Sequence, residues 1–357
     1  MSEGSVFQRA DGRWAAKYRD ASGKWRYLYR KSKSEARKAL RQALKDRDEG
    51  VSPTTITVSA FLDSWLEDMR DAVSHRTWLN HESIVRLHLN PTIGAKKLAK
   101  LTPKDVHGLY RIKLAGGLSP GRVRRIHVTL SRALKDAVRW RDVSRNVAAE
   151  VTPPKEYRRE TRVLTPQQVG QLLDAARGDR LEAAYVLPAT CGLRQGECLS
   201  LRFEDIDFAK GTLQVKRTVW RNQVYPPKTP HSRRAIKLPK IALDTLKRHA
   251  RNNNEAREGW VFPTKHGNPV DAHNFIHRPW KRMLRKAGLP ETTRYHDLRH
   301  GAASLLLSQN VPVPVVSNYL GHANSSITLR IYAHMIEGMD GMAATAMDDA
   351  LGDHSGT

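Results

Sequence analysis

The sequence reads H-D-L-R-H at 296–300, L-G-H at 320–322 and R-I-Y-A-H at 330–334, and the chain is organised around these three motifs. His296 and Arg299 are three residues apart on a predicted helix, so they share a face, on which His300 also lies. Gly321 is a candidate C-cap of the next short helix, with His322 directly after it. Tyr332 comes ten residues later, on a further predicted helix.

Held together, these side chains match the needs of an attack on a phosphodiester. An arginine neutralises non-bridging oxygens, histidines donate hydrogen bonds or move protons, and a tyrosine can be the nucleophile. Taken singly, each has a plainer explanation: a histidine on a helix face is usually structural, a tyrosine usually packs, and an arginine is usually a solvated charge. The spacing of the whole set is what favours catalysis.

The motifs resemble the C-terminal box of the tyrosine recombinase (phage integrase) family. That family also carries an arginine in T-G-x-R-x-x-E, and C-G-L-R-Q-G-E supplies Arg194 here, with Cys191 in the usual threonine place. It carries a lysine on a β-hairpin, and P-P-K-T-P-H-S-R-R supplies Lys228. Gly301 stands where a threonine is common. The match is close over roughly 160–335 and looser over 1–155, and it implies a catalytic set of Arg194, Lys228, His296, Arg299, His322 and Tyr332.

The resemblance also implies a mechanism. Tyr332 attacks the scissile phosphate, forms a 3′-phosphotyrosyl link and frees a 5′-hydroxyl, which then attacks the phosphotyrosine of partner DNA. Two such rounds pass through a Holliday junction and integrate or excise a mobile element, without a metal or other cofactor. The implied roles of the other residues are phosphate binding by Arg194, Arg299 and His322, acceptance of the tyrosine proton by His296, and protonation of the leaving 5′-oxygen by Lys228.

The composition points to a polyanionic partner. The 357 residues include 61 Lys and Arg against 36 Asp and Glu, a formal net charge of +25, which favours nucleic acid. No lipidation motif, signal peptide or apolar run of about 20 residues is present, so a membrane is not expected. Cys191 and Cys198 are expected to be reduced and buried. We expect a cytoplasmic, nucleoid-associated protein.

The chain is long enough for two or three domains, and residues 1–50 are predicted to form the first. Three strands, with turns at Asp11-Gly12 and Ser22-Gly23, precede a helix over 34–49 with Ser34 as its N-cap. Period-two alternation predicts one aromatic face under the helix, made by Trp14, Ala16, Tyr18, Trp25, Tyr27 and Tyr29. It predicts a basic opposite face, either merely solvated or bound in the DNA major groove, made by Arg13, Lys17, Arg19, Lys24, Arg26 and Arg30. The pattern resembles the arm-type DNA-binding domain of some integrases.

A helical core-binding domain is predicted over 58–150, after a short linker at 51–57. The expected helices are 58–70, 74–89, 103–114 and 119–140, with breaks at Pro91–Gly94 and at Gly116-Gly117. The last helix alternates apolar residues with cations, so one face packs and the other is free for phosphates, and Arg122 and Arg125 are its predicted DNA contacts. Residues 141–163 are predicted to be an extended linker.

The third predicted domain, 160–350, is mainly helical with a small antiparallel sheet, so that the whole chain is a multidomain α+β protein. Thr165 is its first N-cap, with Pro166 at the first helical position. Arg194 and Glu197 share a helix face, where Glu197 either holds the arginine or is an ordinary surface partner. Strands are expected near 201–208, 212–220 and 233–238, with Lys228 between the last two, and helices at 241–252 and 273–287.

The expected partners are double-stranded DNA at core and arm sites and three further copies of the chain, in a homotetramer on paired sites. A DNA-bending protein and a directionality factor are further candidates. Two alternatives stay open. A type IB topoisomerase shares the chemistry but relaxes a single duplex, and a DNA-binding regulator would have lost the chemistry. The apolar spacing after Ile336 predicts a tail that docks on a neighbouring protomer or packs on its own domain.

Overall fold

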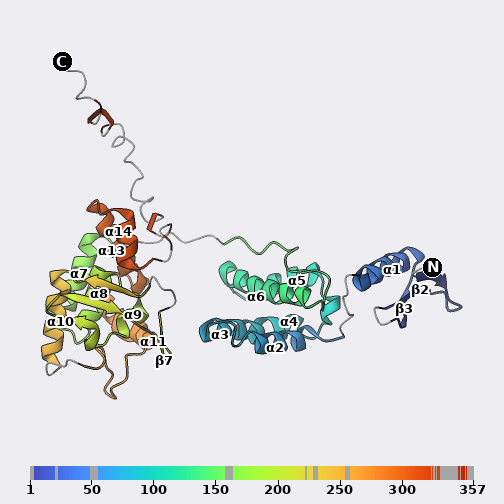
Figure 1. The fold of residues 1–357 in the computed structure, drawn as a ribbon, viewed down its shortest axis with the longest axis horizontal. Coiled ribbons are helices and arrows are strands. Elements are labelled where there is room, and N and C mark those ends of the chain that lie inside the picture. The colour runs from blue at the N-terminus through green and yellow to red at the C-terminus, as the bar shows by residue number, and fades with distance from the viewer. Residues whose placement is uncertain are drawn as a thin grey trace. The chain divides into compact units, whose positions relative to one another are not determined.

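The computed structural model describes residues 4–20, 23–48, 55–156, 164–221, 223–227, 232–253, 258–322, and positions 324, 326, 328, 329, 345, 347–349 and 351. The chain divides into two compact units, Met1–Arg158 and Arg159–Thr357 (Figure 1). Both are mainly helical with small antiparallel sheets, which confirms the predicted fold class. None of the described helices is both long and apolar enough to cross a membrane. Cys191 and Cys198 are buried and free, as expected.

Unit 1 begins with an antiparallel sheet of β1 (Gly4–Gln8), β2 (Trp14–Arg19) and β3 (Trp25–Arg30), followed by helix α1 (Lys33–Asp48). The helix covers one sheet face closely: a Cβ placed on Gly4 would lie 2.7 Å from Leu40 Cδ1. The predicted cap is wrong by two residues. The hydroxyl of Ser32, not Ser34, accepts a hydrogen bond from the Glu35 amide at 3.2 Å and starts the helix.

The predicted division of this sheet into an aromatic and a basic face is wrong. Alternation holds within each strand, but Ala15 pairs with Tyr29, Lys17 with Tyr27 and Arg19 with Trp25. Directly paired residues share a face, so the β3 aromatics lie beside Lys17 and Arg19, away from α1. Trp25 is 42% exposed and Tyr27 45%. The remaining predicted cations are placed differently: Arg26 and Arg30 pair with Tyr18 and Trp14 on the helix side, and Arg13 and Lys24 precede their strands.

The rest of unit 1 is a helical bundle of α2 (Val58–Asp68), α3 (His75–Ile84), α4 (Asn90–Ile93), α5 (Pro103–Ala115) and α6 (Pro120–Arg139). The predicted break at Pro91–Gly94 starts too early, because a π-helical turn at Val85–Leu89 carries the helix past Pro91 into α4, which ends at Ile93 with Gly94 as its C-cap. A π turn shifts the backbone hydrogen bonds by one residue, which accommodates a proline that lacks an amide donor. The apolar stripe of α6 is buried, including Val123, Ile126 and Leu130.

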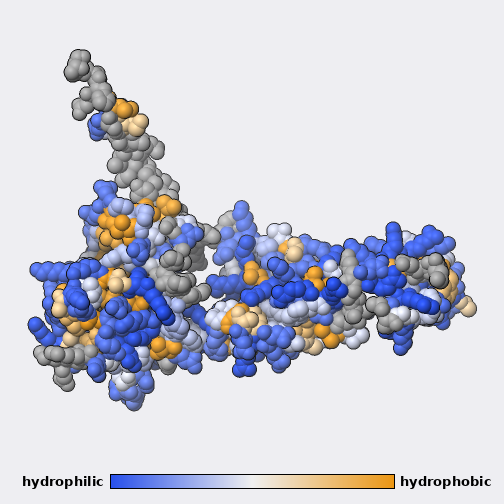
Figure 2. Space-filling model, in the orientation of Figure 1, coloured by the Kyte–Doolittle hydropathy of each residue, from blue (hydrophilic) through white to orange (hydrophobic). Residues whose placement is uncertain are grey.

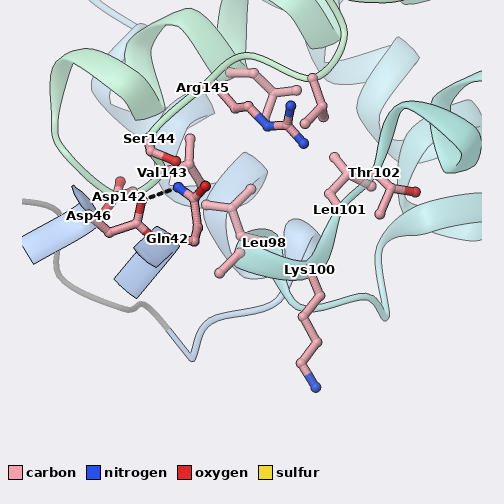
Figure 3. Close-up of a pocket in the computed structure, with 13 residues that line it drawn as sticks. Gln42, Asp46, Leu98, Lys100, Leu101, Thr102, Asp142, Val143, Ser144 and Arg145 are labelled. Atoms are coloured by element: carbon pink, nitrogen blue, oxygen red, sulfur yellow. Dashed lines mark hydrogen bonds between the residues drawn. The ribbon is translucent and has the colours of Figure 1, made fainter. Parts of the chain in front are cut away.

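The predicted linker starts too early. Val147 and Ala148 are buried in the core of the bundle, and Asn146 Nδ2 donates to the carbonyl of Ser131 on α6 at 2.8 Å. Residues 141–151 therefore belong to unit 1. A cleft of about 300 Å³ in the same unit is lined by Leu98, Arg145 and, from α1, Gln42 and Asp46, whose side chains are hydrogen-bonded (Figure 3). None of the predicted catalytic residues that the structure describes lies in it.

Unit 2 is built around α8 (Glu182–Cys191), which is apolar on every side and almost wholly buried. Around it lie α7 (Pro166–Ala176), α10 (Lys240–Asn252) and α13 (Tyr295–Ser308) (Figure 1). The predicted N-cap Thr165 is confirmed, since its hydroxyl accepts from the Gln168 amide at 3.2 Å. The predicted helix 273–287 is α11 (Ala272–Phe275), a π turn (Ile276–Trp280) that contains Pro279, and α12 (Lys281–Lys286).

The described strands of unit 2 form two small antiparallel sheets. One has the strand order β4 (Ile206–Asp207), β5 (Thr212–Val215), β8 (Arg234–Lys237), and the other is the hairpin β6 (Thr218–Trp220) and β7 (Gln223–Tyr225). Two more helices lie at the sequence motifs. Helix α9 (Gln195–Leu199) begins directly after Arg194, and α14 (Val313–Leu320) ends at the L-G-H motif. As a result, Arg194 and the L-G-H motif lie next to each other in the folded unit.

Candidate active site

Arg194 stands at the sharp turn between α8 and α9. Gly192 ends α8 with φ +62°, a conformation that glycine adopts without the strain other residues incur. Glu197 then holds Arg194 twice: Oε1 accepts from Arg194 Nη1 at 2.7 Å and Oε2 from the Arg194 amide at 3.1 Å. Glu197 is only 4% exposed. It is therefore a buried residue that fixes the position of Arg194, rather than an ordinary surface partner.

Arg299 is buried on α13, with 2% of its surface exposed. Its Nη1 donates to the carbonyl of Gly192 at 2.5 Å, which ties α13 to the Arg194 turn. Its Nη2 is buried and has no hydrogen-bond partner among the described residues. Burial first, and then repulsion from Arg194, lower the pKa of Arg299 to about 9. A buried cationic donor of this kind is matched by an anionic oxygen.

The third motif joins the other two through the end of α14. Gly321 has φ +68° and caps the helix as predicted, and its carbonyl accepts from Arg194 Nη2 at 2.7 Å. His322 follows, with its Nδ1 2.7 Å from the Oγ1 of Thr328. Thr328 is fully buried. The structure therefore brings together Arg194, Arg299 and His322, which lie far apart in the sequence.

The imidazoles of the site are neutral near pH 7. Burial and then the charges of Arg299 and Arg194 lower the pKa of His322 to about 3. Desolvation by the surrounding protein, and then His300 and the two arginines, lower that of His296 to about 4, although one side of His296 is open to solvent. The His296 and His300 rings meet edge to face, with centroids 4.8 Å apart.

The sequence gives little sign of a third arginine in the site, Arg234, at the start of β8. Its side chain is 7% exposed, and its Nη2 lies 3.3 Å from Glu197 Oε2. The buried Glu197 carboxylate thus pairs with two arginines, Arg194 and Arg234, and also attracts the charge of Arg299. Arg234 lies within the quoted P-P-K-T-P-H-S-R-R stretch, but in a chain with 61 Lys and Arg nothing marks it out.

Comparisons with known proteins agree with this geometry. A model of the phage integrase family matches residues 162–338, and a model of the phage integrase N-terminal SAM-like domain matches 57–114. An integrase of Streptomyces ambofaciens is 30% identical over 338 residues, which cover 88% of this chain and 86% of the relative. The chain belongs to the phage integrase family. A tyrosine recombinase XerC-like protein of Caldanaerobacter subterraneus subsp. tengcongensis is 28% identical over 327 residues, 82% of this chain and 83% of that protein.

Solved structures share the fold. The integrase of the transposon Tn1549, in complex with transposon right end DNA, superposes with a TM-score of 0.70 at 23% identity, over 83% of this chain and 100% of that one. A lambda integrase tetramer bound to a Holliday junction gives 0.64 at 21% identity, over 91% and 94%. The predicted family is confirmed. As a tyrosine recombinase, this integrase is an enzyme that cleaves and rejoins DNA strands.

Two members of the predicted catalytic set, Lys228 and Tyr332, lie outside the described residues. The strands β7 and β8 end at Tyr225 and begin at Arg234, so Lys228 belongs to the connection between them. The other tyrosines near the motifs are engaged in packing. Tyr295 Oη donates to the carbonyl of Ala184, and Tyr319 Oη lies 3.4 Å from the carbonyl of Lys237. Burial raises the pKa of both phenols.

Proposed function

We propose that Arg194, Arg299 and His322 bind the scissile phosphate of DNA and that Tyr332 attacks it. The observation that supports this most directly is the buried Nη2 of Arg299, which lies beside Arg194 and has no partner within the part of the chain that the structure describes. The two arginines would then neutralise the charge that grows on the non-bridging oxygens in the transition state, and the neutral imidazole would donate a hydrogen bond to one of them. The chain's +25 net charge would draw the DNA to the site.

In the proposed step one P–O bond forms, another breaks, and two protons are transferred. The Tyr332 oxygen forms a bond to phosphorus as the bond to the 5′-oxygen breaks, which leaves a 3′-phosphotyrosine. His296 accepts the phenol proton; its pKa of about 4 keeps it neutral and able to do so near pH 7. Lys228 donates a proton to the leaving 5′-oxygen, a contribution of about 10²–10⁴-fold. The freed 5′-hydroxyl of a partner strand then attacks the 3′-phosphotyrosine, which rejoins the DNA and releases Tyr332. Two such rounds of strand exchange pass through a Holliday junction.

The test is covalent trapping on a nicked suicide substrate. Wild-type protein should accumulate an adduct that maps to Tyr332, and Tyr332→Phe should bind the same DNA with no adduct. Lys228→Ala should cleave ordinary DNA slowly but recover when sulfur replaces the bridging 5′-oxygen, because a thiolate leaves without protonation. An adduct that maps elsewhere, or that persists in Tyr332→Phe, would contradict the assignment. If the wild-type protein forms no adduct, the result favours a DNA-binding regulator. If it relaxes a single supercoiled duplex without strand exchange, the result favours a type IB topoisomerase.

We also propose a division into an arm-binding domain (1–50), a core-binding domain (58–150) and a catalytic domain (160–350). In the first, the exposed β-sheet face would bind duplex DNA through Lys17 and Arg19 set among aromatic rings. Lys17 Nζ lies 4.1 Å from the ring centroid of Trp25. In the second, Arg125 is exposed and Arg122 half-buried on α6, opposite its apolar stripe, in a position to contact phosphates.

The proposed assembly is a homotetramer on two paired sites, because two rounds of strand exchange need four tyrosines. The lambda integrase tetramer on a Holliday junction is the supporting parallel. A neighbour would be contacted through the tail after Ile336. Most of this tail lies outside the described residues, and its described positions, 345, 347–349 and 351, are exposed. A DNA-bending protein and a directionality factor would act on the same complex at the nucleoid in the cytoplasm. Light scattering of the protein on paired sites would test the tetramer.

A further inference from the structure

Arg234 contacts three segments that the sequence keeps far apart. Its Nε donates to the carbonyl of Tyr319 at 2.9 Å, its Nη2 to Glu197 Oε2 at 3.3 Å and its Nη1 to the carbonyl of Ser232 at 3.3 Å. Gly321 lies directly against it, since a Cβ at Gly321 would be 2.7 Å from Arg234 Nη1 and 3.0 Å from its Cδ. The glycine of L-G-H is therefore needed both for its backbone conformation and for this close approach.

The contacts of Arg234 converge on groups that hold the phosphate-binding residues. Glu197 Oε2 accepts from both Arg234 and the Arg194 amide, so the two arginines share one carboxylate. The carbonyls at the end of α14 are shared in the same way: Tyr319 by Arg234, and Gly321 by Arg194. Cations are favoured there because the last carbonyls of a helix lack partners and carry partial negative charge.

We propose that Arg234 is a positioning residue for strand cleavage. It orients Glu197, and thereby Arg194, and it seats the end of α14, and thereby His322, without touching the phosphate. This inference rests on the proposed function of those residues. A lysine would keep the charge but, as a point donor, could not bond the Tyr319 carbonyl and the Glu197 carboxylate with the fixed geometry of the guanidinium fork.

The experiment compares Arg234→Lys with Arg233→Lys in the full chain. Arg233 is the exposed neighbour and gives the same chemical change. In single-turnover cleavage of a suicide substrate, Arg234→Lys should be about 10–100-fold slower, the scale of a misplacement of about 1 Å, with DNA affinity within about twofold of wild type. Arg233→Lys should cleave at the wild-type rate. Wild-type cleavage by Arg234→Lys would overturn the proposal.

A double-mutant cycle separates positioning from an independent contribution. In an Arg194→Ala background, Arg234→Lys should cost several-fold less than in the wild type, because one of the two residues it acts through is gone and only the effect through His322 remains. Fully multiplicative losses would mean that Arg234 does not act through Arg194 and would refute the proposal. If Arg234→Lys loses its thermal transition, the double variant Glu197→Gln/Arg234→Gln removes both buried charges together. It should fold and show the same slow cleavage, and fast cleavage would count against the inference.

Nuclear magnetic resonance of the His322 ring keeps this test separate from that of the proposed function. Arg234→Lys should shift the His322 ring signals, assigned with His322→Asn, while Arg233→Lys should not. This readout needs no cleavage. A wild type that forms no adduct but shows the shift would contradict the proposed function and leave the positioning contact supported. Unshifted signals in Arg234→Lys would overturn the positioning inference even if the wild type cleaves.

Discussion

His322 is neutral near pH 7, so its tautomer decides what it can do. If the Thr328 hydroxyl donates to Nδ1, the proton sits on Nε2, which can then donate to a phosphate oxygen. If Nδ1 donates to Thr328 instead, Nε2 can only accept and would repel the phosphate. Because Thr328 is fully buried beside the ring, we expect the first arrangement to be the productive one.

This makes Thr328 a testable partner of His322. Thr328→Val keeps the shape of the side chain but removes the hydroxyl, and it should slow single-turnover cleavage on the order of 10-fold, the effect of one lost hydrogen bond to a catalytic group. Thr328→Ser is the matched control and should retain most of the rate. Equal rates for Val and wild type would mean that Thr328 does not set the tautomer.

At the level of single residues, the sequence predicts the site residues that lie in spaced motifs, but not those whose roles depend on contacts made when the chain folds. Arg194, His296, Arg299 and His322 are recognisable because each lies in a spaced motif. Arg234 and Thr328 have no such spacing, and their roles arise from contacts with Glu197 and His322 that only the folded chain makes. The contribution of an arginine to the site depends on whether its side chain is exposed to solvent or buried beside a carboxylate, and the composition of the chain does not reveal this.

At the level of elements, periodicity predicts the strands and helices, but not the register between strands. The β2–β3 connection runs from Asp20 to Lys24, an odd number of residues, so Trp25 pairs with Arg19 rather than joining the face of Trp14. A connection one residue longer or shorter would have given the predicted aromatic face. Periodicity also does not predict the π turns that precede Pro91 and contain Pro279, because a proline ends a helix only when the helix cannot shift its hydrogen bonds.

The corrected register predicts which cations of the first sheet bind DNA. Arg19 lies on the exposed face, with its Cζ 4.9 Å from the ring centroid of Trp25, whereas Arg26 lies on the helix side and pairs with Asp20 at 2.8 Å. Arg19→Gln should weaken binding of a short mixed-sequence duplex and lower the salt slope of log K by about one. Arg26→Gln, the same change on the other face, should leave the slope unchanged. The reverse result would restore the face predicted from alternation alone.

At the level of the whole molecule, the excess of positive charge is spread over both units, and hydrophilic residues cover much of the visible surface of each (Figure 2). This charge disfavours further protonation. In seven of the described histidines the pKa lies below the ordinary 6.5, in each case because burial, and to a smaller extent a neighbouring cation, disfavours the imidazolium. These are His81, His88, His127, His249, His296, His300 and His322.

Stability should therefore fall on mild acidification. Below the ordinary pKa of about 6.5 the unfolded chain binds protons at these histidines while the folded chain does not, so the free energy of unfolding decreases as the pH falls. Denaturant titrations at about pH 7.5 and about pH 5.5, above the range where most carboxylates titrate, should show a lower midpoint at the acidic end. His296 is open to solvent, so His296→Gln should fold, and the loss between the two pH values should become smaller. A midpoint that rises on acidification would contradict the lowered pKa values, because proton uptake would then favour the folded state.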